Sequence, residues 1–145
     1  MLDFMRWSYP IGSLFGIPLR VHGSLFLVLG FLLLGFSQES QDVAGWLLPF
    51  MLMIALFASI VIHELGHALT ARRFGIQTRQ IILLPIGGVA LLEDSPSEPK
   101  HEMWIALAGP ATSFALGALT WIVFSISDNQ LAGHLAVINI ALGLF

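Results

Sequence analysis

The sequence contains no cysteine, which excludes disulfide bonds and thiolate metal sites, so any metal ligands must be histidine or carboxylate side chains. Charged residues are also scarce, at 10% of the chain. With six lysines and arginines and a formal net charge of −3, the chain shows no basic surface of the kind that binds nucleic acid, and we expect no such partner. The N-terminal arm, residues 1–20, lacks the basic start, apolar centre and cleavage site of a signal peptide, so we expect it to be retained.

Apolar residues, by contrast, are abundant. The hydrophobic content of 57% and the mean hydropathy of +0.86 are typical of a multi-pass membrane protein and exceed what a soluble core needs. We predict a single-domain, all-α polytopic membrane protein with about four transmembrane helices, the last of them truncated. The expected spans cover about residues 21–36, 46–71, 103–127 and 131–145.

Residues 78–92 interrupt this helical pattern. The stretch is apolar, but it is too short, and too often broken by Pro85, Gly87 and Gly88, to be another span. It predicts a small β-hairpin between the second and third spans. Because exposed non-helical backbone is not tolerated in lipid, the hairpin should line a cavity or lie against protein.

The basic residues indicate an orientation. All six fall on segments that share one side of the membrane if the spans alternate in direction. The positive-inside rule then places the N-terminus and the end of the second span in the cytoplasm. The fourth span is still apolar at Phe145, where the sequence ends, so we expect the sequence to be part of a longer protein.

The second span carries the pattern H-E-x-x-H, formed by His63, Glu64 and His67. On a helix the two histidines share one face and can bind one metal ion, while Glu64 lies about 100° round the helix and can reach a water on that metal. Ionisable groups at membrane depth are functional by default. The motif therefore predicts one Zn²⁺ per active site, held by His63 and His67, with Glu64 as the catalytic base.

A catalytic zinc site needs a third protein ligand. The depth of the motif along its span corresponds, in the fourth span, to a position just past Phe145. His134 is too close to the opposite membrane surface, and Asn139 is better suited to joining helices. We therefore expect the third ligand beyond Phe145, and residues 1–145 alone to lack a competent zinc site.

The sequence resembles the site-2 protease family of intramembrane zinc metalloproteases over nearly its whole length. Four stretches carry the resemblance, at residues 16–22, 63–67, 84–89 and 105–110. It implies that residues 1–145 are the N-terminal part of the transmembrane protease domain. It also implies that the third zinc ligand is the aspartate of a later Leu-Asp-Gly segment.

The resemblance further implies hydrolysis of peptide bonds within or near the transmembrane helices of membrane proteins, with Glu64 activating a zinc-bound water. The expected partners are a transmembrane protein substrate and the lipid bilayer, and self-association stays open. A helical substrate must unwind before attack, so residues 78–92 could receive it as an added strand, with Gly87 and Gly88 as candidate substrate-binding residues. The expected location is the cell (inner) membrane of a prokaryote, with the N-terminus and the active-site opening on the cytoplasmic side.

Two other functions fit the same motif. A prenyl-protein protease also carries H-E-x-x-H on a helix, but it would need a larger helical shell and a downstream Glu ligand. A non-catalytic membrane metal-binding or transport protein could use His63, Glu64 and His67 as an ion site. Such a transporter should place further ionisable groups along a path through the bilayer, and His134 is the one candidate.

Overall fold

The computed structural model describes residues 6–39 and 42–145. Its described elements are β-strands and α-helices that alternate in blocks along the chain. In order they are β1 (Ser8–Leu14), β2 (Ile17–His22), α2 (Gly23–Glu39), α3 (Val43–Arg73), β3 (Thr78–Leu84), β4 (Gly87–Leu92), α4 (Pro99–Ser127) and α5 (Gln130–Leu144).

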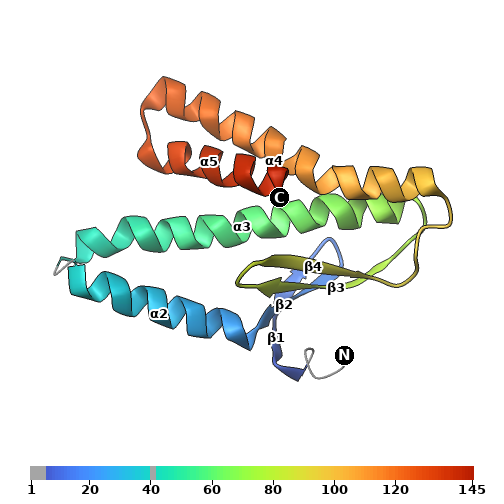
Figure 1. Ribbon diagram of the computed structural model, residues 1–145, viewed down its shortest axis with the longest axis horizontal. Helices are drawn as coiled ribbons and strands as arrows, with labels where there is room; N and C mark the ends of the chain where they lie inside the picture. Colours follow the sequence, from blue (N-terminus) through green and yellow to red (C-terminus); the bar gives the residue numbers. More distant parts are fainter. Residues whose placement is uncertain (1–5, 40–41) are drawn as a thin grey trace.

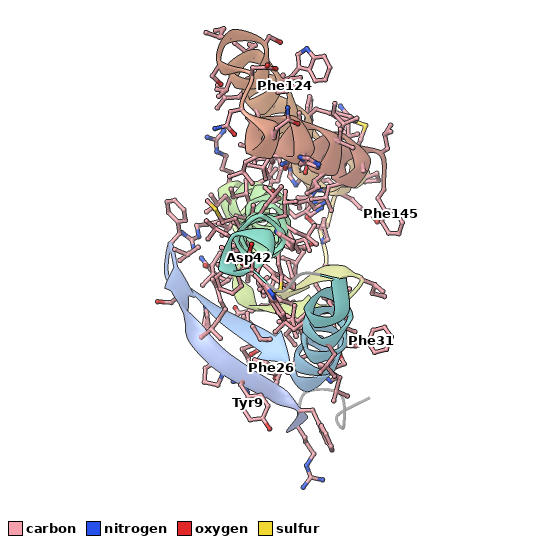
Figure 2. All side chains as sticks on the ribbon, turned by 90° about the vertical axis from the view of Figure 1, so that its left-hand side faces the viewer. Tyr9, Phe26, Phe31, Asp42, Phe124 and Phe145 are labelled. Carbon is pink, nitrogen blue, oxygen red and sulfur yellow. The ribbon has the colours of Figure 1, made fainter. Side chains whose placement is uncertain are left out.

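Helix α3 runs through the middle of the molecule. The sheet and α2 lie on one side of it, and α4 and α5 lie on the other (Figure 1). The view turned by 90° shows the same order of layers (Figure 2). A residue on α3 can therefore contact the sheet or α4, depending on the helix face that it occupies.

The four strands form one mixed sheet in the order β1-β2-β3-β4. β1 with β2 and β3 with β4 are antiparallel hairpins, whereas β2 and β3 run parallel, with Leu19 opposite Ile81. Helices α2 and α3 make the long connection that a parallel strand pair requires. The first hairpin turns at Phe15 and Gly16, whose φ angles of 51° and 78° are both left-handed.

The sheet overturns the prediction of an all-α fold. No strand was predicted in the N-terminal arm, residues 1–20, but it forms β1 and most of β2, so the sheet has four strands rather than the two of the expected hairpin. The reason is an alternating pattern in β2, where Ile17, Leu19 and Val21 are buried and their neighbours are not. Three alternating apolar residues bury little surface by themselves, but beside β3 they complete one apolar face of the sheet.

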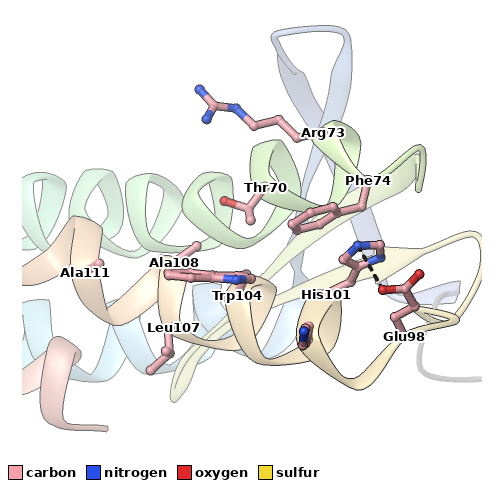
Figure 3. A pocket seen from close by; sticks show the side chains of 10 residues that line it. Thr70, Arg73, Phe74, Glu98, His101, Trp104, Leu107, Ala108 and Ala111 are labelled. Atoms are coloured by element: carbon pink, nitrogen blue, oxygen red, sulfur yellow. Dashed lines mark ion pairs between the residues drawn. The ribbon is translucent and has the colours of Figure 1, made fainter.

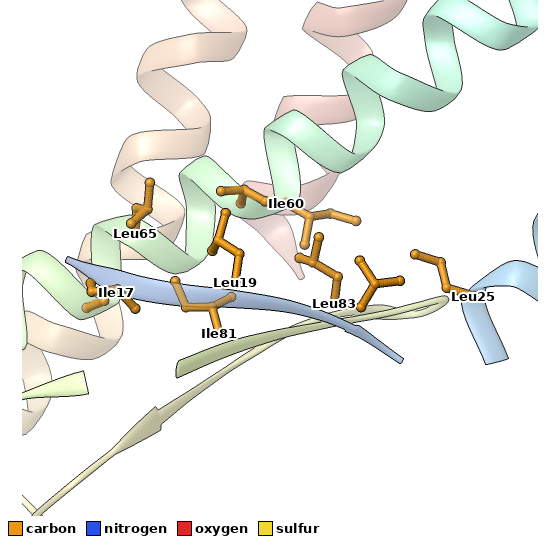
Figure 4. Close-up of a cluster of buried hydrophobic side chains, with 10 residues drawn as sticks. Ile17, Leu19, Leu25, Ile60, Leu65, Ile81 and Leu83 are labelled. Carbon is orange, nitrogen blue, oxygen red and sulfur yellow. The ribbon is translucent and has the colours of Figure 1, made fainter. Parts of the chain in front are cut away.

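That apolar face packs on α3 and forms the main core. Side chains from β2 and β3 meet those of α3 and the start of α2, as Figure 4 shows. Ile17 and Ile81 are 1% and 0% exposed, so the sheet is firmly seated on the helix. The core consists of Ile17, Leu19, Val21, Leu25, Ile60, Val61, Leu65, Ala68, Ile81 and Leu83.

Among the described residues, two helices rather than four are long and apolar enough to cross a membrane. They cover Gly45–Arg73 in α3 and Pro99–Ser127 in α4. The helical segments Gly23–Gly35 and Gln130–Leu144 are apolar but shorter. The expectation of about four spans is therefore corrected to two candidates by length. In each of the two helices, 17% of the most apolar window is buried inside the protein, so most of that window is on the molecular surface.

Candidate metal centre

His63 and His67 lie on the face of α3 that packs against α4. Their Nε2 atoms are 3.2 Å apart, and the ring centroids are separated by 4.9 Å. Because the residues are one helical turn apart, the helix alone brings the two rings to one place. The structure thus brings together the two residues that the sequence predicted as ligands.

The Nδ1 atom of each histidine ring contacts an oxygen atom on α4. The Nδ1 of His67 lies 2.7 Å from the carbonyl oxygen of Ile105, and a carbonyl can only accept, so Nδ1 carries the hydrogen. The Nδ1 of His63 lies 2.8 Å from the hydroxyl oxygen of Ser113, which can accept in the same way. With both Nδ1 atoms donating, the Nε2 lone pairs of both rings are free to bind a metal ion.

The separation of the two Nε2 atoms suits a metal ion. Two nitrogens at about 2.0–2.1 Å from one tetrahedral Zn²⁺ lie about 3.3–3.4 Å apart. The observed 3.2 Å is close to this value without any rearrangement of the helix. Neutral histidine is also a preferred zinc ligand, so the residues present fit zinc in both distance and chemistry.

Glycines make the space that the two rings occupy. A Cβ on Gly109 would lie 2.7 Å from Nε2 of His63 and would also collide with the ring of His67. A Cβ on Gly66, between the two histidines, would lie 2.8 Å from the carbonyl oxygen of Ala108. Helices α3 and α4 can therefore approach closely only because both positions are glycine.

Glu64 lies on a different face of α3, against the second hairpin. Its side chain is buried and lies beside the backbone of Ala90 on β4. A Cβ on Gly88 would lie 3.0 Å from Oε1 of Glu64, so this glycine admits the carboxylate. Of the two predicted substrate-binding glycines, Gly88 is next to Glu64, whereas Gly87 sits at the hairpin turn with open space around it.

The sequence alone did not reveal the residues that hold the site. Gly109, Ser113 and Gly117 are spaced four apart, a pattern that is typical of a helix-packing face, but two of them contact the histidines. Their spacing equals that between His63 and His67, which is the signal that could have indicated this role. The contacts of Ile105 and Ala90 are made by backbone atoms, which leave no sequence signal.

The other candidate residues lie elsewhere. The ring of His134 contacts the carbonyl oxygen of Gln130, and Asn139 is fully buried, donating to Ser59 and to the carbonyl of Leu135. Within residues 6–39 and 42–145, no group of three His, Asp or Glu side chains is arranged to hold a metal ion. His63 and His67 are thus a two-ligand site among the described residues.

Two histidines one turn apart, fixed by a neighbouring helix and adjacent to a buried glutamate, define a helix-borne metallopeptidase type of centre. The family model "Peptidase family M50" matches residues 51–145. The chain belongs to this family, that of the site-2 proteases.

Relatives match nearly the whole chain. A putative zinc metalloprotease of Synechocystis sp. is 39% identical over 99% of this chain, and a zinc metalloprotease of Methanocaldococcus jannaschii is 36% identical over 97%. The chain spans 41% of the length of each of these two relatives. The solved site-2 protease from Methanocaldococcus jannaschii superposes with a TM-score of 0.79 at 35% identity, covering 96% of this chain and 63% of that one.

Family membership also bears on location. Site-2 proteases are embedded in membranes, and α3 and α4 are each long and apolar enough to cross one. The chain is therefore part of a membrane protein, and its histidine pair lies on one of the two candidate membrane-spanning helices.

Proposed function

We propose that the protein carrying this chain is an intramembrane zinc metalloprotease that hydrolyses peptide bonds within or near the transmembrane helices of membrane proteins. The observation that carries the proposal is the pair of Nε2 atoms 3.2 Å apart, each backed by an acceptor on α4. The zinc metalloprotease names of the relatives support the same metal. No observation favours a prenyl-protein protease or a transporter.

His63 and His67 would hold the zinc through Nε2, with a third protein ligand from outside the described residues. When bound, zinc supplies Lewis-acid chemistry, polarising a carbonyl and easing the deprotonation of water. Ser113 and Ile105 keep the two rings oriented, and α4 excludes solvent from their far side.

Glu64 is the proposed general base. It takes a proton from the attacking water and passes it to the leaving amine, so the C–N bond breaks as a C–O bond forms. Its carboxylate lies against β4, beside Gly88 and the backbone of Ala90. Its side chain is buried there, one residue along α3 from His63.

The substrate would bind as an added strand along β4. This strand is at the edge of the sheet, and Glu64 lies beside its backbone at Gly88 and Ala90. Since backbone groups alternate along an edge strand, every second residue of β4 presents its N–H and C=O outward. An unwound substrate segment pairing there would have its backbone satisfied next to the proposed base. Proline substitutions along this edge that left cleavage unchanged would rule the role out.

The proposed location is the cell membrane, with the site opening to the cytoplasm. Arg72 and Arg73 end α3, and Lys100 begins α4, so three cations lie at one end of the two long helices. The turn between α4 and α5, at residues 128–129, has no basic residue. Under the positive-inside rule the basic end is cytoplasmic, and His67 lies about 8 Å inside it.

The direct test is cleavage of a transmembrane substrate by the full-length protein and by its Glu64→Gln variant. We expect the variant to lose activity by about 10²–10⁴-fold, because the amide cannot accept the proton. Glu93→Gln, in the exposed segment after β4, is the matched control and should cleave normally. Equal cleavage by wild type and Glu64→Gln would overturn the proposal.

A further inference from the structure

A cavity lies between α3 and α4, beyond the histidine pair towards the end of α3. It has a volume of about 490 Å³ and is lined by the end of α3 and the first four turns of α4. On α3, its lining residues Thr70 and Phe74 follow His67 by three and seven residues, so the cavity lies on the histidine side of this helix, nearer the helix end. Neither histidine lines it, so the cavity adjoins the proposed active site without including the ligand pair.

Exposed cations from both helices line this cavity. Arg73 from α3 and Lys100 from α4 both line it and are exposed, and neither has a carboxylate within 4.0 Å among the residues that the structure describes. The one acidic residue of the lining, Glu98, pairs with His101 at 3.7 Å. The ring of His101 in turn stacks on Phe74, with centroids 4.1 Å apart. Since Glu98 lies more than 4.0 Å from both Arg73 and Lys100, the two cations are available to an anion.

The inner part of the cavity is apolar. Figure 3 shows Trp104, Leu107, Ala108 and Ala111 following one another along α4, with the Glu98–His101 pair at its start. Trp104 and Leu107 are 56% and 52% exposed, so this surface continues onto the lipid-facing side of the helix. Trp104 is one turn inside Lys100, which is the depth at which tryptophan lies beside lipid headgroups.

Lining cations from both helices and an apolar floor that continues along α4 match an amphiphile with a negatively charged head. We propose that this cavity binds an anionic phospholipid, with its phosphate between Arg73 and Lys100 and one acyl chain along Leu107 and Ala111. Free phosphate shares the headgroup chemistry but would make no use of the apolar floor. A bound lipid would join the end of α3 to the start of α4.

The test is lipid binding by the purified protein in detergent, measured by mass spectrometry of the intact complex. Phosphatidylglycerol and phosphatidylcholine are added separately, and inorganic phosphate is a third probe. We expect phosphatidylglycerol to bind in preference to phosphatidylcholine, and Arg73→Gln or Lys100→Gln to weaken it about fivefold each. Arg79→Gln removes an exposed cation from β3 and should leave binding unchanged.

A second pair of variants tests the apolar floor. Ala111→Trp should fill the cavity and abolish phosphatidylglycerol binding, while Ala118→Trp, exposed on the same face seven residues further along, should not. Circular dichroism checks that both variants fold. Equal binding of the two lipids, an equal effect of Arg79→Gln, or displacement of phosphatidylglycerol by inorganic phosphate with no effect of Ala111→Trp would overturn the proposal.

Discussion

At the residue scale, the site depends on glycine residues as much as on ionisable side chains. His63 and His67 can share a metal ion only where α4 leaves room for two rings, and Gly109 leaves that room. Ser113 and the carbonyl of Ile105 then accept from Nδ1 of His63 and His67, so that Nε2 of each ring is free. The ligand pair is thus set by α3, while its orientation is set by α4.

This division predicts the effect of Ser113→Ala. Removal of the hydroxyl leaves Nδ1 of His63 without its partner, and we expect zinc affinity to fall about 10–100-fold. Competition with a metal chelator measures the change. Ser125→Ala is the control, because that exposed hydroxyl contacts only the carbonyl oxygen of Trp121, and an equal loss in both variants would contradict the assignment.

Gly109→Ala tests the space between the helices. The added Cβ would lie 2.7 Å from Nε2 of His63, so one or both rings must move. We expect zinc affinity to fall at least as far as in Ser113→Ala, with helical content unchanged by circular dichroism. Gly30→Ala, where a Cβ meets nothing within 4 Å, should bind zinc like the wild type. Normal zinc binding by Gly109→Ala would show that the rings are placed differently.

At the scale of elements, the sheet positions Glu64. β4 supplies the backbone at Ala90 and the open position of Gly88, and β4 is itself held through β3 and β2 against α3. The first hairpin therefore contributes to the site without touching it. Its role is to complete the apolar face that seats the sheet on the helix.

The Ile81→Ala variant tests how much the packing of the sheet on α3 contributes to the free energy of unfolding. Ile81 is fully buried between the sheet and α3, so its truncation should lower the free energy of unfolding by about 2–5 kcal/mol. Ile86→Ala is the matched control, because Ile86 is 87% exposed in the turn before β4. Thermal unfolding in detergent compares the two. A loss of stability in Ile86→Ala as large as that in Ile81→Ala would mean that the core is elsewhere.

The limits of sequence-based prediction follow from the range of each interaction. His63 and His67 are four residues apart, so helix geometry alone indicates a shared ligand face. Ser113 is 50 residues from His63, and the parallel pairing of Leu19 with Ile81 joins positions 62 residues apart. No local pattern carries such contacts. The first hairpin was missed for a local reason as well, because Phe15 takes a left-handed position where Asn or Gly is usual.

At the scale of the whole molecule, α3 packs between two layers and uses a different face for each. One face meets α4 and carries the ligand pair, and another meets the sheet and carries the proposed base. Figure 1 shows this central place of α3 between the two layers. The metal and the base can therefore meet only at the boundary of the layers, which is also where the edge of β4 would present an unwound substrate.

The measurement that tests the central claim most directly is the zinc content of the purified full-length protein and of three variants. We predict about one zinc per wild-type chain, loss of zinc in His63→Ala and His67→Ala, and retained zinc in Glu64→Gln. Retained zinc in either histidine variant, or loss of zinc in Glu64→Gln equal to that in His63→Ala, would contradict the account.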